Sequence, residues 1–270
     1  MRFLSELIGG GILKLRARAI SGGIGKGELL LLDKPFGFLG GVDPSTGRLS
    51  HNSGTEGMNL AGKVFAFPSG KGSTVGSYTL LQLKREGKVP AAIINQKAET
   101  IVATGAVMAS VPMVDSVNLS LLAQGDLVTV DADSGVVEVE GIDESHVVTC
   151  IIKFKGKILA LKRSDEVSTC KGMWAGVSGY IEKGETPLET AFKEIREEAA
   201  IDTPTLIHQT EIQSIRAGSR VWHIHPFLFE SPTDRVTIDW EHTEYKWIDP
   251  AEADSMSAVP GFVRVLKALL

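Results

Sequence analysis

The segment at residues 179–201, GYIEKGETPLETAFKEIREEAAI, limits the fold of this chain more than any other stretch, because it contains both a helix start and a buried face. Thr186 precedes Pro187, a residue favoured at the first helical position, and Glu189 completes the spacing of a capping box. Apolar residues then recur at helical spacing at Leu188, Phe192, Ile195 and Ala199. The sequence therefore predicts a helix that begins near Pro187 and packs one apolar stripe against a core.

Three carboxylates lie on another side of the same predicted helix. Glu194, Glu197 and Glu198 are spaced i, i+3 and i+4, so their like charges destabilise the helix unless a cation compensates them. Clustered carboxylate oxygens are the ligands that a hard cation such as Mg²⁺ prefers. The alternative is a solvated acidic face with no ligand.

The fixed positions of this segment resemble the Nudix box. They are Gly179, Glu185 after five residues, a basic residue after seven more, and then the carboxylates, a small residue and an aliphatic one. Lys193 stands where the family has arginine, and Ala200 stands where it usually has glycine. Lys193 could pair with Glu189 one turn earlier or orient a carboxylate as that arginine does, although lysine lacks the planar fork of arginine. The resemblance implies a Nudix α/β/α sandwich.

Resemblance to Nudix hydrolases also implies attack of water on a diphosphate linkage. In this interpretation Glu197 and Glu198 hold Mg²⁺, and Glu194 is a further ligand or the base that orients the water. The metal would neutralise phosphate oxygens and lower the pKa of a bound water. Because Lys193 and Ala200 depart from the Nudix pattern, an alternative stays open. In this alternative the domain is a non-catalytic module that binds a diphosphate and regulates its partner.

Composition limits the remaining classes of protein. At 270 residues the chain has room for two domains, and its 43% apolar and 23% charged residues are typical of globular proteins. A net charge of -5 provides no basic footprint for nucleic acid. Cys150 and Cys170 are too few for a disulfide framework or for an iron–sulfur cluster held by this chain alone. Glu6 interrupts the early apolar residues 3–13, and no run is long enough to span a bilayer, so we expect a cytoplasmic protein.

A glycine-rich loop dominates the first half. Residues 63–67 form a short apolar strand that enters PSGKGSTVGS at residues 68–77, and a helix is predicted beyond Ser77 that ends near Gly87. A strand, a glycine loop and a helix N-terminus together favour anions. The loop is not a P-loop, because Phe65 stands in place of its first glycine and Gly72 follows Lys71.

The rest of the first half indicates a β-rich α/β domain with one prominent helix. Residues 15–33 are predicted as two strands around a glycine turn, although Gly23, Gly25 and Gly27 also allow a nucleotide-loop interpretation. Further strands are expected at residues 91–95, within the apolar residues 101–114, and in a hairpin at 127–131 and 136–140.

Several motifs of this half, GGVDPSTG, PSGKGSTVGS, INQKAE and VPMVD, resemble the swivelling small subunit of the aconitase X family over about residues 15–139. The similarity is greatest to small subunits of the archaeal phosphomevalonate dehydratase type. It implies a swivelling β/α domain that closes over a separate large subunit, which carries the iron–sulfur cluster. It also implies that Ser73 accepts the substrate proton. Related two-subunit enzymes act on cis-3-hydroxyproline, which stays an alternative substrate.

The residues themselves leave two roles for Ser73. One is a helix cap, a common role for serine at such a position. The other is a base whose alkoxide is stabilised at the helix N-terminus by the backbone N–H groups of Gly70, Lys71 and Gly72. The Lys71 side chain would assist the same anion or hold a phosphate or carboxylate of a small phosphorylated substrate.

We place the domain boundary between residues 143 and 144, so that a swivel domain at 1–143 precedes a Nudix domain at 144–270. In the second domain a hairpin is expected at 146–154 and 157–162, and Trp174 is expected in the core. His223 and His225 share one face of a strand at 221–229; without a third ligand, a surface or substrate contact is preferred over metal. Glu241 or Glu244 could add a carboxylate near the metal, and residues 262–269 close the chain as an amphipathic helix.

Overall fold

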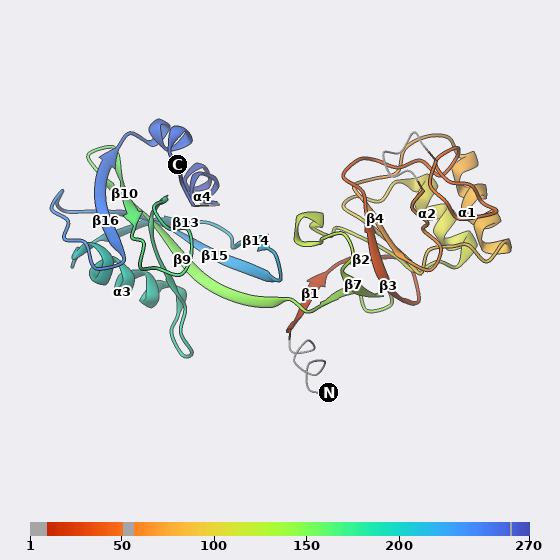
Figure 1. Ribbon diagram of the computed structural model, residues 1–270, viewed down its shortest axis with the longest axis horizontal. Helices are drawn as coiled ribbons and strands as arrows, with labels where there is room; N and C mark the ends of the chain where they lie inside the picture. Colours follow the sequence, from red (N-terminus) through yellow and green to blue (C-terminus); the bar gives the residue numbers. More distant parts are fainter. Residues whose placement is uncertain (1–9, 51–56, 260) are drawn as a thin grey trace. The chain divides into compact units, whose positions relative to one another are not determined.

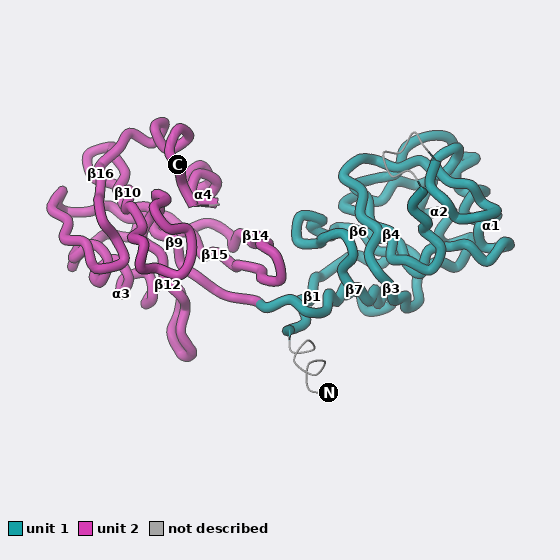
Figure 2. The backbone as a smooth tube through the Cα atoms, in the orientation of Figure 1, with its two compact units in different colours: residues 1–143 teal, residues 144–270 magenta. Residues whose placement is uncertain are grey.

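The computed structural model describes residues 10–50, 57–259 and 261–270. The chain divides into two compact units, Met1–Asp143 and Glu144–Leu270 (Figure 2). Each unit has its own sheet and its own core. Most of the apolar residues 3–13 lie outside the described residues. No helix in the described ranges is long and apolar enough to cross a membrane.

Unit 1 is built on an eight-stranded mixed sheet in the order β1-β8-β7-β3-β4-β5-β6-β2. The neighbours β3/β4, β4/β5 and β5/β6 are parallel, and the other pairs are antiparallel. Every residue of β4 and β5 is buried, as expected for central parallel strands covered on both faces. The strands are β1 (Ile12–Arg16), β2 (Arg18–Ser21), β3 (Ile24–Leu31), β4 (Val64–Phe67), β5 (Ala92–Asn95), β6 (Met113–Asp115), β7 (Leu127–Asp131) and β8 (Val136–Glu140).

Two helices connect the parallel strands, and they lie side by side (Figure 1). Helix α1 (Val75–Arg85) joins β4 to β5, and α2 (Thr100–Ala109) joins β5 to β6; a short 3₁₀ helix, η2 (Leu119–Leu121), follows β6. Gly105 permits the close helix contact, because a Cβ there would lie 2.7 Å from the Leu80 side chain and 3.0 Å from the Ser77 backbone.

The prediction of strand segments within residues 101–114 is wrong for most of this stretch, which forms α2, and only its end belongs to a strand, β6. Local signals for the helix were present but faint. The Glu99 side chain accepts a hydrogen bond from the Ile101 N–H at the N-terminus, and Ser110 ends the helix in the left-handed conformation. The β-branched residues of the segment favour strands, and the tertiary contact at Gly105 outweighs that preference.

Aromatic rings fill the core of unit 1 beneath the glycine loop. Phe36 packs edge-to-face on Phe38 at 5.2 Å and on Phe65 at 5.0 Å between ring centroids. The backbone of Phe36 also pairs with the loop: its carbonyl accepts the Lys71 N–H at 3.0 Å, and its N–H donates to the Ser69 carbonyl at 3.1 Å. The loop of residues 68–74 is therefore fixed to the aromatic core.

Unit 2 has an eight-stranded sheet with the central order β11-β10-β9-β15-β13, to which β12, β14 and β16 pair at β9, β15 and β10. The hairpin predicted around Gly156 is present as β9 and β10. The elements are β9 (Asp143–Phe154), β10 (Lys157–Arg163), β11 (Trp174–Ala175), β12 (Val177–Tyr180), α3 (Pro187–Ala199), β13 (Thr205–Gln209), β14 (Gln213–Ala217), β15 (Arg220–Glu230), β16 (His242–Ile248), the 3₁₀ helix η3 (Pro250–Ser255) and α4 (Phe262–Leu269).

Helices α3 and α4 cover opposite faces of this sheet, which makes the α/β/α sandwich (Figure 1). Alternate residues of β9 serve the two cores: Val148 and Cys150 pack with α3, whereas Val147 and Ile151 pack with α4. Trp174 is buried on the α4 side, as predicted. The fold class predicted from the sequence, two α/β domains of which the second is a three-layer sandwich, is confirmed.

The start of α3 is also confirmed in detail. Thr186 occupies the N-cap, its hydroxyl accepts the Glu189 N–H, and the Glu189 carboxylate accepts the Thr186 N–H at 2.9 Å. The apolar stripe of the helix enters the core, with Ile195 and Ala199 fully buried. These contacts fix which side of α3 is left for Glu194 and Glu198.

Candidate functional site

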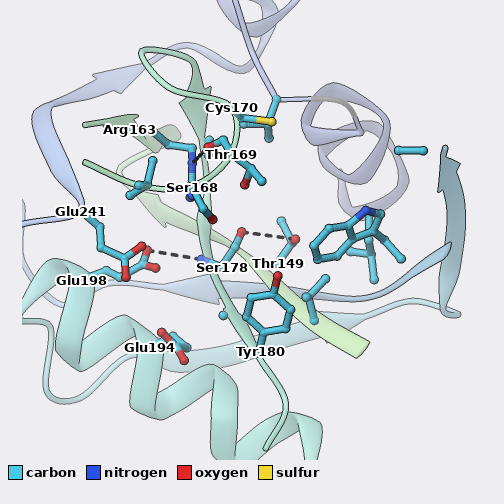
Figure 3. Close-up of a pocket in the computed structure, with 18 of the residues that line it drawn as sticks. Thr149, Arg163, Ser168, Thr169, Cys170, Ser178, Tyr180, Glu194, Glu198 and Glu241 are labelled. Atoms are coloured by element: carbon cyan, nitrogen blue, oxygen red, sulfur yellow. Dashed lines mark hydrogen bonds between the residues drawn. The ribbon is translucent and has the colours of Figure 1, made fainter. Parts of the chain in front are cut away.

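A cavity of about 830 Å³ opens in unit 2, and the carboxylates of α3 line it (Figure 3). Its walls come from β9, β12, α3, β14, β15 and the loops after β10 and before β16. One wall is aromatic, with the rings of Tyr180 and Trp222 5.7 Å apart, and the other end is acidic.

The acidic end consists of Glu194, Glu198 and Glu241 (Figure 3). Glu198 is only 3% exposed, and its carboxylate accepts the Ser178 N–H at 3.3 Å. Burial, followed by the charge of Glu194, raises the pKa of Glu198 well above its ordinary value. Burial and the charge of Glu197 raise the pKa of Glu194 to about 7. These carboxylates therefore disfavour one another's ionisation in the absence of a cation.

Gly179, a fixed position of the Nudix-like pattern, has a specific steric role beside this cluster. The Glu194 carboxyl group lies directly against the Gly179 backbone, where the Cβ of any other residue would collide with it. Glycine on β12 thus lets a carboxylate of α3 approach the strand. The sequence pattern identified the residue, and the structure supplies its physical reason.

The three glutamates predicted to act together have different surroundings. Glu194 and Glu198 line the cavity, whereas Glu197 is exposed and lies outside the lining, so its role as a ligand stays a prediction. Of the two further candidates, Glu241 lines the cavity. Glu244 pairs instead with Lys246 at 3.0 Å and Lys162 at 3.7 Å.

The donor set at the acidic end fits a hard divalent cation. Two carboxylates with raised pKa values and a third beside them form an oxygen-rich environment that a cation would stabilise. As the side chains lie, no group of three or more His, Cys, Asp or Glu residues in the described part of the chain is arranged to hold a metal ion. Binding would therefore draw the carboxylates together.

Lys193 holds the start of α3 through two other carboxylates. Its Nζ lies 3.0 Å from Glu185 and 3.3 Å from Glu182, and the Thr190 hydroxyl also donates to Glu185 at 2.8 Å. The hydrogen bond to Glu185 raises the pKa of Lys193 further above its ordinary value. The predicted pairing with Glu189 is wrong, because Glu189 is engaged in the capping box. The other predicted role, orienting a carboxylate, is what the contacts show.

His242 is a site residue that the sequence reasoning missed. It is 5% exposed; its Nδ1 lies 2.9 Å from Asp239 Oδ1, and its Nε2 lies 3.9 Å from Glu198 Oε2. The i, i+3 spacing of Asp239 and His242 was the available signal, but their separation of more than forty residues from Glu198 in the sequence hid the link to it.

In unit 1 the glycine loop presents Ser73 at the start of α1. Ser73 is exposed, and its Oγ accepts the Val75 N–H at a long 3.4 Å, so capping by Ser73 is weak. The side chain of Thr74, at the N-cap position, makes no capping hydrogen bond. Gly72 has a φ of 109°, a conformation that disfavours any residue with a Cβ.

The predicted ring of three backbone N–H groups around Ser73 needs correction at one position. The Lys71 N–H donates to the Phe36 carbonyl and is not free for an anion, so Lys71 can contribute only through its exposed side chain. Gly70 is required by packing, since a Cβ there would lie 2.6 Å from Val102. The roles of Gly70, Gly72 and Ser73 toward a substrate stay predictions.

Comparison with known proteins agrees with this division. Residues 14–139 match the aconitase X swivel domain, and residues 144–269 match the NUDIX domain. The first half is 56% identical over 129 residues to the phosphomevalonate dehydratase small subunit of Thermococcus onnurineus, a match covering 47% of this chain and 99% of the relative. The subunit of the same name from Methanosarcina acetivorans is 45% identical over 130 residues, and the match covers 47% of this chain and 90% of the relative.

Solved structures resemble each half separately. Aconitase X of Thermococcus kodakaraensis in its holo form has 53% identity and a TM-score of 0.46, covering 47% of this chain and 98% of that one. The MutT protein of Methanosarcina mazei has 21% identity and a TM-score of 0.42, and the match covers 47% of this chain and 93% of that one. Fold and matches define a swivel domain joined to a Nudix domain. The chain belongs to the family of phosphomevalonate dehydratase small subunits, here extended by the Nudix domain.

Proposed function

We propose that this chain is the small subunit of a phosphomevalonate-dehydratase-type hydro-lyase fused to a Mg²⁺-dependent Nudix hydrolase of a diphosphate linkage. Residues 1–143 would serve the dehydration and residues 144–270 the hydrolysis. The identity of the first half to named dehydratase subunits supports the first activity. The cavity lined by Glu194, Glu198 and Glu241 supports the second.

Elimination of water needs a base for the C–H proton and a Lewis acid for the departing hydroxyl group. In the proposal Ser73 accepts the proton, and the exposed Lys71 side chain holds the substrate phosphate. An iron–sulfur cluster on an aconitase-X-type large subunit would supply the Lewis acid, which agrees with only two cysteines in this chain, both free.

The surface around Ser73 supports such a partner. Val75 and Tyr78 on α1 are large, apolar and exposed, and so is Leu39. Leu39 lies beside the first turn of α1, because a Cβ placed on Gly76 would be 3.8 Å from the Leu39 backbone N. A partner that covered these apolar side chains would also exclude bulk water from the hydroxyl, and dehydration requires a water-poor site.

The Ser73→Ala chain, co-expressed with the large subunit, tests this assignment. We expect dehydration of phosphomevalonate to fall by at least about a hundredfold, the typical contribution of a positioned acid–base group. Thr74→Ala is the matched control, because the Thr74 side chain is exposed and makes no capping bond. Full activity of Ser73→Ala would refute the role, and turnover of cis-3-hydroxyproline alone would replace the substrate.

For hydrolysis, Mg²⁺ would neutralise phosphate oxygens and lower the pKa of a bound water. Glu198, held by the Ser178 N–H, and Glu241 would be its ligands from this chain. Glu194 has a pKa of about 7 and is suited to take a proton from the attacking water near neutral pH.

A phosphate-release assay with Mg²⁺ and a panel of nucleoside and isoprenoid diphosphates tests the hydrolase. Glu198→Gln should lose activity by about a hundredfold or more, because it removes a charged ligand from the buried end of the cavity. Glu211→Gln, at an exposed glutamate outside the lining, should behave as the parent chain. A Glu198→Gln chain with full activity would contradict the assignment.

A second candidate for the Nudix domain is a non-catalytic diphosphate sensor that regulates the dehydratase. Lys193 and Ala200 favour it as departures from the Nudix pattern, and Ala200 adopts a left-handed φ of 55° where glycine is less strained. A sensor would be stabilised thermally by a diphosphate without turnover, whereas the hydrolase would release product.

A further inference from the structure

Three of the six histidines of the chain gather in unit 2 outside the cavity. His146 belongs to the start of β9, and His223 and His225 belong to β15. Adjacent residues of a strand point to opposite faces of the sheet, and the residues next to these histidines line the cavity. The histidines therefore lie on the face of the sheet away from the cavity. These cavity-lining neighbours are Val147, Thr149, Trp222 and Ile224.

The imidazoles contact one another directly. His146 Nδ1 lies 3.1 Å from His225 Nε2, and the His146 ring stacks on His223 with centroids 4.6 Å apart. His223 Nε2 lies 2.7 Å from the Glu144 carboxylate, and its Nδ1 lies 2.9 Å from the Ser214 hydroxyl. Because a carboxylate only accepts, the hydrogen in the contact with Glu144 comes from Nε2 of His223.

The cluster is open to solvent, and an imidazole ligates a metal ion through a ring nitrogen that carries no proton. His146 is exposed and His225 is partly exposed, so an ion can reach the cluster from solvent.

The spacing of the two facing nitrogens also suits an ion. Two nitrogens bound to one tetrahedral Zn²⁺ at about 2.0–2.1 Å are separated by about 3.3 Å, close to the 3.1 Å between His146 Nδ1 and His225 Nε2. An ion would replace the single proton shared by these nitrogens, and that proton would move to the other nitrogen of its own ring. Backbone movement is not required for these two ligands.

We propose that His146 and His225 form a binding site for a borderline transition-metal ion such as Zn²⁺, with His223 as a third ligand after rotation of its ring. The rotation is required because, as the side chains lie, no three such donors of the described residues are arranged to hold an ion. It would release His223 Nδ1 from Ser214, while Glu144 keeps Nε2–H oriented, the carboxylate–histidine arrangement common beside metal ligands.

This site differs from the acidic cavity in both ligand chemistry and position. Imidazole nitrogens suit zinc, nickel and copper, whereas the carboxylates of the cavity suit magnesium. A bound ion would join the first residues of β9 to β15 and act as a structural clamp at the start of unit 2. The site does not depend on the proposed hydrolase activity.

Zn²⁺ titration of the full chain by calorimetry tests the site. We expect His225→Gln to weaken one binding event by about tenfold or more, and Glu144→Gln to weaken it by a similar factor through the orientation of His223. The matched control is His208→Gln, at an exposed histidine on neighbouring β13. Glu198→Gln should leave this binding event intact, because Glu198 belongs to the cavity.

A measurement on the unchanged chain avoids any effect of a substitution on folding. In imidazole ¹⁵N NMR, Zn²⁺ should shift the nitrogens of His146 and His225 and leave those of His208 in place. Absence of these shifts would overturn the proposal. So would binding that persists in His225→Gln and is lost in Glu198→Gln, because Zn²⁺ would then occupy the acidic cavity.

Discussion

At the scale of single residues, the carboxylates of the cavity couple stability to pH. The folded state raises the pKa of Glu194 to about 7 and that of Glu198 well above normal. A carboxyl group with a raised pKa contributes stability at low pH that is lost as the pH rises through the folded-state pKa. A bound cation reverses this loss, since it favours the ionised form.

We therefore expect the stabilisation by Mg²⁺ to grow between about pH 5 and about pH 8. The difference between the unfolding midpoints with and without Mg²⁺ separates the contribution of the carboxylates to the pH dependence of stability from that of the histidines. His146 and His225 have lowered pKa values and act in the opposite direction below their ordinary range. Tryptophan fluorescence reports on unit 2 alone, because all four tryptophans lie in residues 144–270. A Mg²⁺ effect independent of pH would contradict the assignment.

At the scale of elements, the start of α3 is defined by signals in its own sequence. Thr186→Ala should remove the hydroxyl of the capping box and lower the free energy of unfolding by about 1 kcal/mol. Denaturant unfolding followed by tryptophan fluorescence measures this change. Thr203→Ala, at an exposed threonine after the helix, should stay near the parent value. Equal stability of the two variants would show that the cap contributes nothing.

The contrast between α3 and α2 shows what local sequence can predict. α3 has a capping box, a proline at its first position and one apolar stripe, all within its own residues. α2 is identified by contacts from elsewhere, above all the approach of Leu80 to Gly105, and its isoleucine and valines alone favour strands. The cavity follows the same rule: Glu194 and Glu198 were predictable from helical spacing. Asp239 and His242, which join Glu198 through folding, were not.

At the scale of the whole molecule, each unit contains its own candidate site. The cavity is lined by residues 147–259, and the Ser73 loop is fixed to the aromatic core of unit 1. Each unit also has a core of its own, so substitutions in one site should act on that site alone if the two activities are independent.

The two variants that test the separate activities therefore also test their independence when each is assayed for both reactions. Ser73→Ala should lose dehydration and keep diphosphate hydrolysis, and Glu198→Gln should show the reverse, each retained activity staying within about twofold of the parent chain. These assays use the full chain with its large subunit. Glu198→Gln could instead change the rate of dehydration or make that rate insensitive to an added diphosphate. Either result would identify the Nudix domain as a sensor coupled to Ser73. A cavity that only hydrolyses its own substrate has no means of altering proton removal in the other unit.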